Sequence, residues 1–242
     1  MKIALISDIH GNLEALEAVL ADCEGRKVDK VHCLGDVVGY GSDPGPCLEL
    51  IQAHCDIRLM GNHEHAVLGQ LSTDLLNPIA KSSMAWTKDQ LSDKHLTTMN
   101  DFLMDATFEN LYFVHASPFE PDKWHYILTT SEAERAFQHL PKQIGFAGHS
   151  HLPLIFSKGP AGPMHMYVGH DFHPFEENQY LVNVGSVGQP RDNDPRACYV
   201  IFDSSEQELT YYRVEYDMQL TQSKMSRANL PKMLIDRLLV GR

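Results

Sequence analysis

Residues 2–10 read KIALISDIH, an apolar run followed at once by two residues able to bind a metal ion, Asp8 and His10. The run predicts a strand that is buried on both of its faces. After it, apolar residues recur at helical spacing from 13 to 20, and Asn12 stands where it can cap that helix. This order of strand, polar turn and helix is typical of α/β proteins.

The same arrangement of apolar run and polar residue recurs four more times along the chain. VHCLG precedes Asp36, IRLMG precedes Asn62, LYFV precedes His115, and IGFAG precedes His149. Ligands of open α/β sheets bind just beyond the carboxyl ends of the strands, so we expect these residues to converge on one edge. Each of them alone is more often a solvated or capping residue, but together they predict a metal site.

Strand and helix patterns alternate along the chain, which indicates an α/β fold. The candidate strands span residues 2–7, 30–34, 56–60, 111–114, 144–147, 154–157, 180–184, 197–203 and 208–214. Further helices are expected at 46–54 and 231–240. We expect a single domain over residues 1–242 with a helical insertion at about 66–105, and the later strands suggest a second, more antiparallel sheet.

The expected insertion contains apolar residues at helical spacing, among them Leu75, Leu76, Met84, Trp86 and Met99. They have two interpretations. In the first, Met84, Trp86 or Met99 contacts the substrate, because the insertion follows directly after a metal-binding motif. In the second, which we favour, these side chains form the insertion's own core.

Composition narrows the classes of function. The chain has 242 residues and a net charge of −12, which disfavours binding to long nucleic acids because no basic patch is present to neutralise several phosphates. Its five cysteines form no CxxC pair, so we expect reduced thiols and a cytoplasmic protein. The longest apolar runs are too short for a membrane helix.

The candidate metal ligands are Asp8, His10, Asp36, Asn62, His115, His149 and His151. Carboxylate, amide and imidazole groups together suit Mn(II), Fe(II), Zn(II) or Ni(II) better than Mg(II). Seven ligands exceed the needs of one tetrahedral ion, so we expect two divalent ions ~3.5 Å apart, bridged by one carboxylate. Such a pair clamps the attacking and leaving oxygens of a phosphoryl displacement, and a bridging water becomes the nucleophile.

These motifs resemble those of the calcineurin-like metallophosphoesterase superfamily in identity and in order. They are DIH at 8–10, GD at 35–36, GNHE at 61–64, His115 at the end of a strand, and GHSH at 148–151. The resemblance covers roughly residues 1–200. It implies a four-layer αββα sandwich of two mixed β-sheets flanked by helices. It also implies that Asp8, His10 and His151 hold one ion, that Asn62, His115 and His149 hold the other, and that Asp36 bridges them.

The resemblance further implies that His63, one residue beyond a metal ligand, acts as the general acid that protonates the leaving group. The other interpretation is that His63 caps a helix or pairs with Glu64 or Asp36. Residues 183–203 look like the tail of a branch of small bacterial and archaeal phosphodiesterase-like proteins, which are also described as diadenosine tetraphosphatase-like. There Arg191 either contacts a phosphate or pairs with a neighbouring aspartate.

We therefore expect a two-metal phosphodiesterase or phosphomonoesterase that acts on small substrates, nucleotides among them, with Asn12 and Arg191 as candidate substrate contacts. After Asp36 comes VVGYG, where Ser/Thr phosphatases and symmetrical dinucleoside tetraphosphatases carry a phosphate-binding arginine, which makes those two activities less favoured. The alternative is a non-catalytic scaffold of the same fold that binds other proteins. Retention of His63 and of every ligand position argues against the scaffold.

Overall fold

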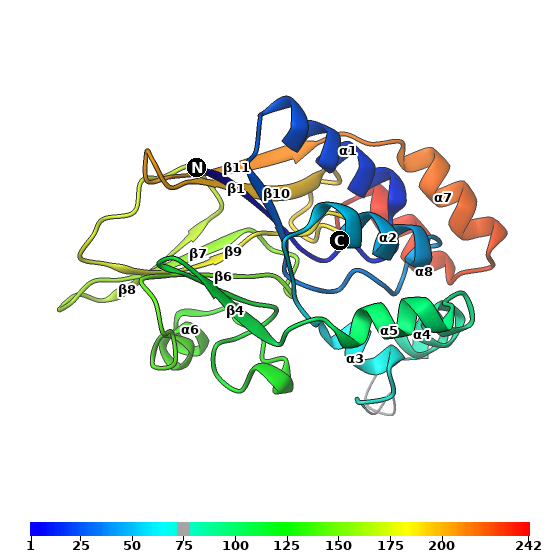
Figure 1. Ribbon diagram of the computed structural model, residues 1–242, viewed down its shortest axis with the longest axis horizontal. Coiled ribbons are helices and arrows are strands. Elements are labelled where there is room, and N and C mark those ends of the chain that lie inside the picture. Colours follow the sequence, from blue (N-terminus) through cyan, green and yellow to red (C-terminus); the bar gives the residue numbers. More distant parts are fainter. Residues whose placement is uncertain (72–77) are drawn as a thin grey trace.

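The computed structural model describes residues 1–71 and 78–242. Two mixed β-sheets pack face to face, with strand orders β11-β10-β1-β2-β3 and β4-β5-β6-β9-β7-β8 (Figure 1). The first sheet contains β1 (Lys2–Ile6), β2 (Lys30–Cys33), β3 (Ile57–Arg58), β10 (Ala197–Asp203) and β11 (Glu208–Val214). The second contains β4 (Asp105–Phe108), β5 (Leu111–Val114), β6 (Ile144–Ala147), β7 (Leu154–Lys158), β8 (Met164–Val168) and β9 (Gln179–Asn183).

Helices flank the two sheets. They are α1 (Leu13–Gly25), α2 (Pro44–His54), α3 (Asn62–Val67), α4 (Pro78–Asp89), α5 (Asp93–Asn100), α6 (Thr130–Phe137), α7 (Met218–Arg227) and α8 (Lys232–Asp236), with 3-10 turns η2 (Pro121–Lys123) and η3 (Arg237–Leu239). In Figure 1, α1 and α2 lie beside the first sheet and α6 lies beyond the second. The predicted four-layer αββα architecture is therefore confirmed. None of the described helices is long and apolar enough to span a membrane.

The apolar run of strand β1 is continuous because both faces of the strand are buried. Ile3 and Leu5 enter the cluster between the two sheets, where Phe113 and Phe146 meet them from the second sheet. Ile6 points the other way, into the cluster that the helices cover. A strand that is buried on both faces needs apolar residues at every position, and the sequence supplies them.

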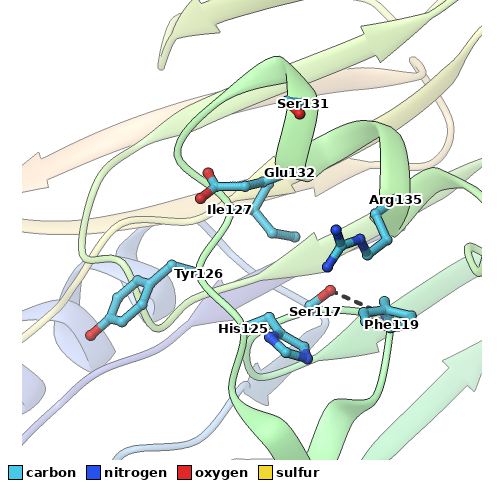
Figure 2. A pocket seen from close by; sticks show the side chains of 8 residues that line it. All are labelled: Ser117, Phe119, His125, Tyr126, Ile127, Ser131, Glu132 and Arg135. Carbon is cyan, nitrogen blue, oxygen red and sulfur yellow. Dashed lines mark hydrogen bonds between the residues drawn. The ribbon is translucent and has the colours of Figure 1, made fainter.

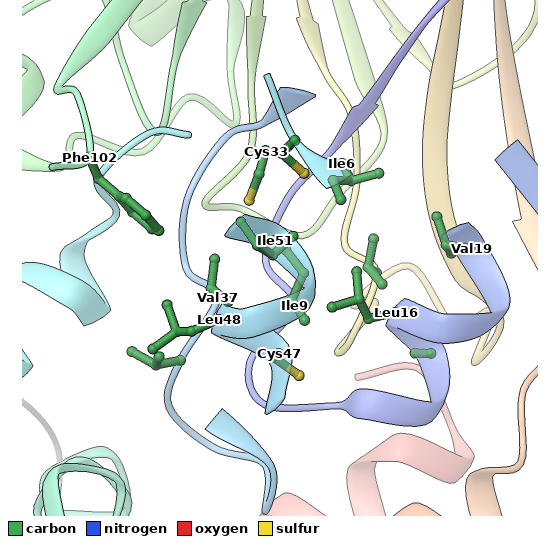
Figure 3. Close-up of a cluster of buried hydrophobic side chains, with 14 of the residues drawn as sticks. Ile6, Ile9, Leu16, Val19, Cys33, Val37, Cys47, Leu48, Ile51 and Phe102 are labelled. Atoms are coloured by element: carbon green, nitrogen blue, oxygen red, sulfur yellow. The ribbon is translucent and has the colours of Figure 1, made fainter. Parts of the chain in front are cut away.

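The helix-covered cluster fixes α1 and α2 on the first sheet. Leu16 and Val19 of α1 and Leu48 and Ile51 of α2 are buried together with Ile6 (Figure 3). The side chain of Asn12 caps α1 by accepting a hydrogen bond from the N–H of Ala15 at 3.2 Å, as predicted. On the opposite side of the molecule, a separate cluster joins α6 to the second sheet.

Several elements differ from the sequence-based predictions. Strands β4 and β8 and helices α6 and α7 were not predicted, since they are short or carry few apolar residues. Of the later strands, β7, β8 and β9 lie in the second sheet, but β10 pairs antiparallel with β1 and extends the first. The expected final helix is shorter, because the chain tightens into η3 after Asp236.

The region of the expected insertion contains α3, α4 and α5. Met84 and Met99 are buried in the helix-covered cluster, and Trp86 packs against the cluster of the C-terminal helices. This packing supports a core role for all three side chains rather than a contact with substrate. Leu75 and Leu76 lie outside the described residues.

Candidate metal centre

The predicted ligands converge on one edge of the molecule, at the carboxyl ends of strands from both sheets. Strands β1, β2 and β3 run parallel in the first sheet, and β5 and β6 run parallel in the second. Asp8, Asp36 and Asn62 follow the first three strands, while His115 and His149 follow the other two. The two sheets therefore contribute ligands from both sides of one site.

The side chains come close enough to share ions. The groups Asp8/His10/His151 and Asp36/His115/His149 each place their ligand atoms within 4.8 Å of one another. These groups agree with the two sites implied by the family resemblance, and the role of Asn62 as a further ligand of the second site stays a prediction. A third group on the same distance criterion contains His10, Asp36 and His63, so His63 also faces the centre.

The backbone at the centre adopts an unusual conformation. Five of the candidate ligands have positive φ angles: Asp8 (55°), His10 (50°), Asp36 (52°), His149 (66°) and His151 (59°). Residues other than glycine rarely occupy this left-handed region, and a cluster of them indicates a functional site at which local strain is maintained by the surrounding fold. Nothing in the sequence pattern predicted this feature.

Backbone carbonyls orient three of the imidazoles. The Nδ1–H groups of His10, His115 and His151 donate to the carbonyl oxygens of Val38 (3.2 Å), Leu34 (2.7 Å) and Gln189 (2.6 Å), respectively. Because a carbonyl can only accept, each neutral ring must carry its proton on Nδ1 and present the lone pair of Nε2 to the centre.

Several ligand atoms at the centre are buried without a hydrogen-bond partner. Asp8 Oδ1, Asn62 Oδ1, His115 Nε2 and His149 Nε2 all have this property. Buried polar atoms are normally satisfied, and each orphan costs ~1–3 kcal/mol. Oxygen and imidazole nitrogen atoms facing one space are the donor set of divalent transition ions, so the residues fit a metal centre.

Electrostatics at the centre favour ionised Asp8 and Asp36 and a neutral His149, the protonation states that bind a metal ion, whereas they favour a proton on His115. Burial acts to raise the pKa of Asp8, but His151 and His115 outweigh it and lower that pKa overall. The pKa of Asp36 is likewise well below its usual value, because His115 and other imidazoles outweigh burial. Burial lowers the pKa of His149 to about 3, whereas the carboxylates overcome burial at His115 and raise its pKa to about 9. Ionised carboxylates therefore surround a site where a divalent cation can replace the proton of His115.

Glu64 is a functional residue that the sequence analysis did not identify. Its fully buried carboxylate accepts hydrogen bonds from the backbone N–H groups of Asp36 (2.9 Å), Val37 (2.8 Å), Val38 (3.1 Å) and Gly61 (2.9 Å). It therefore ties the loop after β2 to the N-terminus of α3. Burial and the carboxylate of Asp36 raise the pKa of Glu64, while its backbone donors oppose that shift.

Glycines permit the close approach of these loops. A Cβ atom on Gly61 would overlap Asp36 Oδ1, and one on Gly39 would overlap His63 Nδ1. Gly39 also has a φ of 87°, which side chains disfavour. Glycine at position 61 therefore lets the backbone lie close to Asp36.

His63 lies on α3 and is buried against the centre. Its backbone N–H donates to Asp36 Oδ1 at 2.9 Å, and its Nε2 is 3.9 Å from Asp36 Oδ2. Its ring meets that of His10 at 4.5 Å and that of Tyr40 at 4.6 Å. The imidazole therefore lies beside the ligands without a carbonyl partner that would fix its tautomer.

The two candidate substrate contacts differ in their surroundings. Asn12 is buried, and its side chain already donates to the Gly188 carbonyl (2.9 Å) while it caps α1. The contact of Asn12 with substrate stays a prediction, whereas its helix-capping role is seen in the structure. Arg191 donates a hydrogen bond from Nη2 to Gln189 Oε1 (3.1 Å). It forms no ion pair with an aspartate among the described residues.

Two tyrosines at the rim were also missed by the sequence analysis. Tyr40 stands against His10 at 4.6 Å, and Tyr126 stacks on His149 at 4.1 Å. Tyr126 also lines a cavity of about 440 Å³ together with Phe119, His125 and Arg135, shown in Figure 2. Aromatic residues in loops carry no strand-end signal, so a search for metal ligands could not find them.

Comparisons with known proteins agree with this geometry. A model of the calcineurin-like phosphoesterase superfamily domain matches residues 1–207. The chain is 37% identical to the uncharacterised protein MJ0912 of Methanocaldococcus jannaschii over 99% of this chain and 98% of that protein. The crystal structure of a metallophosphoesterase from Sphaerobacter thermophilus superposes with a TM-score of 0.89 at 39% identity, covering 100% and 99% of the two chains.

The fold extends to more distant proteins. A putative diadenosine tetraphosphatase superposes with a TM-score of 0.55 at 14% identity, covering 88% of this chain and 94% of its own. At that identity the likeness concerns the fold alone. The family model and the metallophosphoesterase structure, together with the clustered Asp and His side chains, establish the class of protein. The chain belongs to the calcineurin-like phosphoesterase superfamily, and it is a metal-dependent phosphoesterase.

Proposed function

We propose that the protein hydrolyses mono- or diesters of phosphate in small molecules, nucleotides among them, with two divalent ions from the series Mn, Fe, Zn and Ni. The observation that carries this proposal is the set of orphaned, buried ligand atoms at one edge, contributed by both sheets. Asp8, His10 and His151 would hold one ion, Asn62, His115 and His149 the other, and Asp36 would bridge them. When bound, such ions supply Lewis-acid polarisation of the phosphoryl oxygens and a nucleophile at neutral pH.

The chain's own residues have distinct tasks in this proposal. The carbonyls of Val38, Leu34 and Gln189 keep three imidazoles oriented, and Glu64 keeps the loops after β2 and β3 together. His63 donates a proton to the leaving-group oxygen, since it lies beside the ligands and no carbonyl of the described residues fixes its tautomer. We propose that the protein acts in the cytoplasm on a small substrate and does not act on long nucleic acid.

Hydrolysis by the purified chain tests this function. After saturation with Mn(II), we expect turnover of bis-p-nitrophenyl phosphate, p-nitrophenyl phosphate or a member of a nucleotide panel. Metal content measured by mass spectrometry on the same sample should approach two ions per chain. Fewer than two ions and no turnover, after supplementation with each metal, would favour the scaffold alternative.

A pair of histidine variants tests the proton donor. His63→Ala should retain its metal and lose about 10²- to 10⁴-fold in kcat. His65→Ala is the matched control, because His65 lies on the same helix but packs against Trp124 and belongs to none of the described metal-binding groups. Normal turnover by His63→Ala, or an equal loss in both variants, would contradict the assignment.

A further inference from the structure

Two arginines, Arg191 and Arg237, flank Tyr40 at the rim of the metal centre. The backbone N–H of Arg191 donates to the carbonyl oxygen of His151 at 3.2 Å, which places this residue directly beside a ligand. Burial lowers the pKa of His151, and the positive charge of Arg191 is the next largest cause. The guanidinium of Arg191 therefore acts on the centre at short range.

Arg237 approaches Arg191 from the C-terminal turn η3. Its Nε donates to the backbone oxygen of Arg242, which leaves its two Nη groups for other partners. Burial lowers the pKa of Arg237, and the charge of Arg191 lowers it further, while Tyr40 opposes the shift. Tyr40 connects the two arginines in space: it lines one cavity with Gln189, the side-chain partner of Arg191, and another cavity with Arg237, although the arginines are 46 positions apart in the sequence.

No side-chain carboxylate neutralises this pair within the described residues. Elsewhere the chain places an aspartate against an arginine at such positions: Arg196 pairs with Asp194 at 2.6 Å, and Arg213 pairs with Asp192. Arg191 has only Gln189 as a side-chain partner, and its Nε is buried with no partner. Arg191 thus has a buried donor without a partner, and Arg237 has two Nη groups beyond its bond to Arg242, so these half-buried guanidinium groups suit an anion that arrives with the substrate.

A cavity of about 290 Å³ adjoins the pair. Its lining is mostly apolar and comprises Tyr40, Pro78, Ile79, Met233, Leu234 and Arg237. The ring of Tyr40 forms one wall, and its other contacts are His10 and His63 at the centre, each at 4.6 Å. Tyr40 and the two arginines therefore lie between the metal centre and an apolar cavity, and this cavity lies between α4 and α8.

We propose that Arg191 and Arg237 bind a second phosphate group of the substrate, so that the preferred substrates are phosphate esters or anhydrides with two or more phosphates and an uncharged organic part. This inference rests on the proposed function, in which the scissile phosphate occupies the metal centre. Guanidinium groups bind phosphate through paired, charge-assisted hydrogen bonds. The organic part lies against Tyr40 in the apolar cavity.

The larger cavity on the other side of the centre is less suited to a second phosphate. Figure 2 shows Glu132 and Arg135 lining the same cavity, so a carboxylate faces the space that a phosphate would enter. Arg135 is exposed, and its guanidinium lies over the ring of Phe119, 5.4 Å from the centroid. Arg135 is therefore the matched control for Arg237, since it is an arginine that lines another cavity, the one that also contains Tyr126.

Calorimetric titration of the metal-loaded full chain with ADP and with AMP tests the inference, because these ligands differ by one phosphate. We expect the wild-type protein and Arg135→Gln to bind ADP at least tenfold more tightly than AMP. Arg237→Gln should lose about 10- to 100-fold in ADP affinity, the contribution of a charge-assisted hydrogen bond, and keep its AMP affinity. Unchanged AMP affinity also shows that the variant is folded.

The outcomes separate this inference from the proposed function. An ADP preference that survives Arg237→Gln, or that Arg135→Gln reduces equally, overturns the second-phosphate site even if bis-p-nitrophenyl phosphate is hydrolysed. Binding needs no turnover, so a protein without hydrolytic activity that loses its ADP preference in Arg237→Gln would support the site while it contradicts the proposed hydrolysis.

Discussion

Glu64→Gln is the substitution that best tests how the loops that carry the candidate metal ligands are held together. The two carboxylate oxygens of Glu64 each accept two backbone N–H groups: Oε2 accepts those of Asp36 and Gly61, and Oε1 accepts those of Val37 and Val38. A glutamine fills the same space but has one oxygen and one NH2 group. Whichever way the amide is turned, two buried N–H donors then face another donor.

The size of the effect follows from that count. Each buried donor left without an acceptor costs ~1–3 kcal/mol, so two of them predict a loss of about 2–6 kcal/mol in the free energy of unfolding. Urea denaturation followed by circular dichroism, with EDTA present to remove any contribution from bound metal, measures this quantity.

Glu132→Gln is the matched control. The carboxylate of Glu132 also accepts two backbone N–H groups, from Leu128 (2.8 Å) and Thr129 (2.9 Å), but it is exposed at the start of α6. Both bonds use one oxygen, and water can replace them, so its loss should stay below about 1 kcal/mol. Equal losses in the two variants would refute the reasoning that buried, fully accepting geometry makes Glu64 important.

Three further predictions concern other parts of the chain. Asp36→Asn should reduce bound metal below the wild-type content in mass spectrometry, because the amide keeps one oxygen but loses the charge; full occupancy would contradict the bridging role. Gly39→Ala should lower kcat more than it lowers metal content, since the new Cβ would overlap His63. Burial acts to raise the pKa of Asp22, but hydrogen bonds from Arg26 and Tyr199 lower it, so its contribution is present at neutral pH and is lost as the pH falls through the folded-state pKa. Asp22→Asn should therefore lower the urea midpoint at pH 7, and the difference from the wild type should shrink as the pH falls below 3.8 towards the lower folded-state pKa.

The sequence predicted the site more completely than it predicted the fold. Strand ends are marked locally, by a buried apolar run that stops at a polar residue, and parallel strands then bring those ends to one edge without further information. This local pattern is enough to predict that Asp8, Asp36 and His149 lie together, although they are far apart in the chain. Their distances agree with that prediction.

What the sequence did not predict depends on pairings between distant segments. Strand β10 has the same apolar character as the strands of either sheet, and only its register against β1 decides where it lies. Short edge strands such as β8 have no buried face to impose alternation, and four of its five residues are exposed. Arg237 lies beside Tyr40 only because the C-terminal turn folds back against that residue, a contact that no local pattern encodes.

The division between centre and rim suggests how this scaffold is used. The candidate ligands follow core strands, and Glu64 binds the intervening loops through buried backbone groups. A substitution there should therefore lower both the free energy of unfolding and the metal content. Tyr40, Tyr126 and Arg191 contact the centre from segments outside those strands, and Arg237 lies beside Tyr40, so substitutions at these positions leave the core intact. Strain at five left-handed ligand residues is tolerated because the sheets beneath them are buried on both faces. Substrate preference should therefore be alterable at the rim while the chemistry of the centre is retained, and the contrast between Arg237→Gln and Asp36→Asn measures that separation.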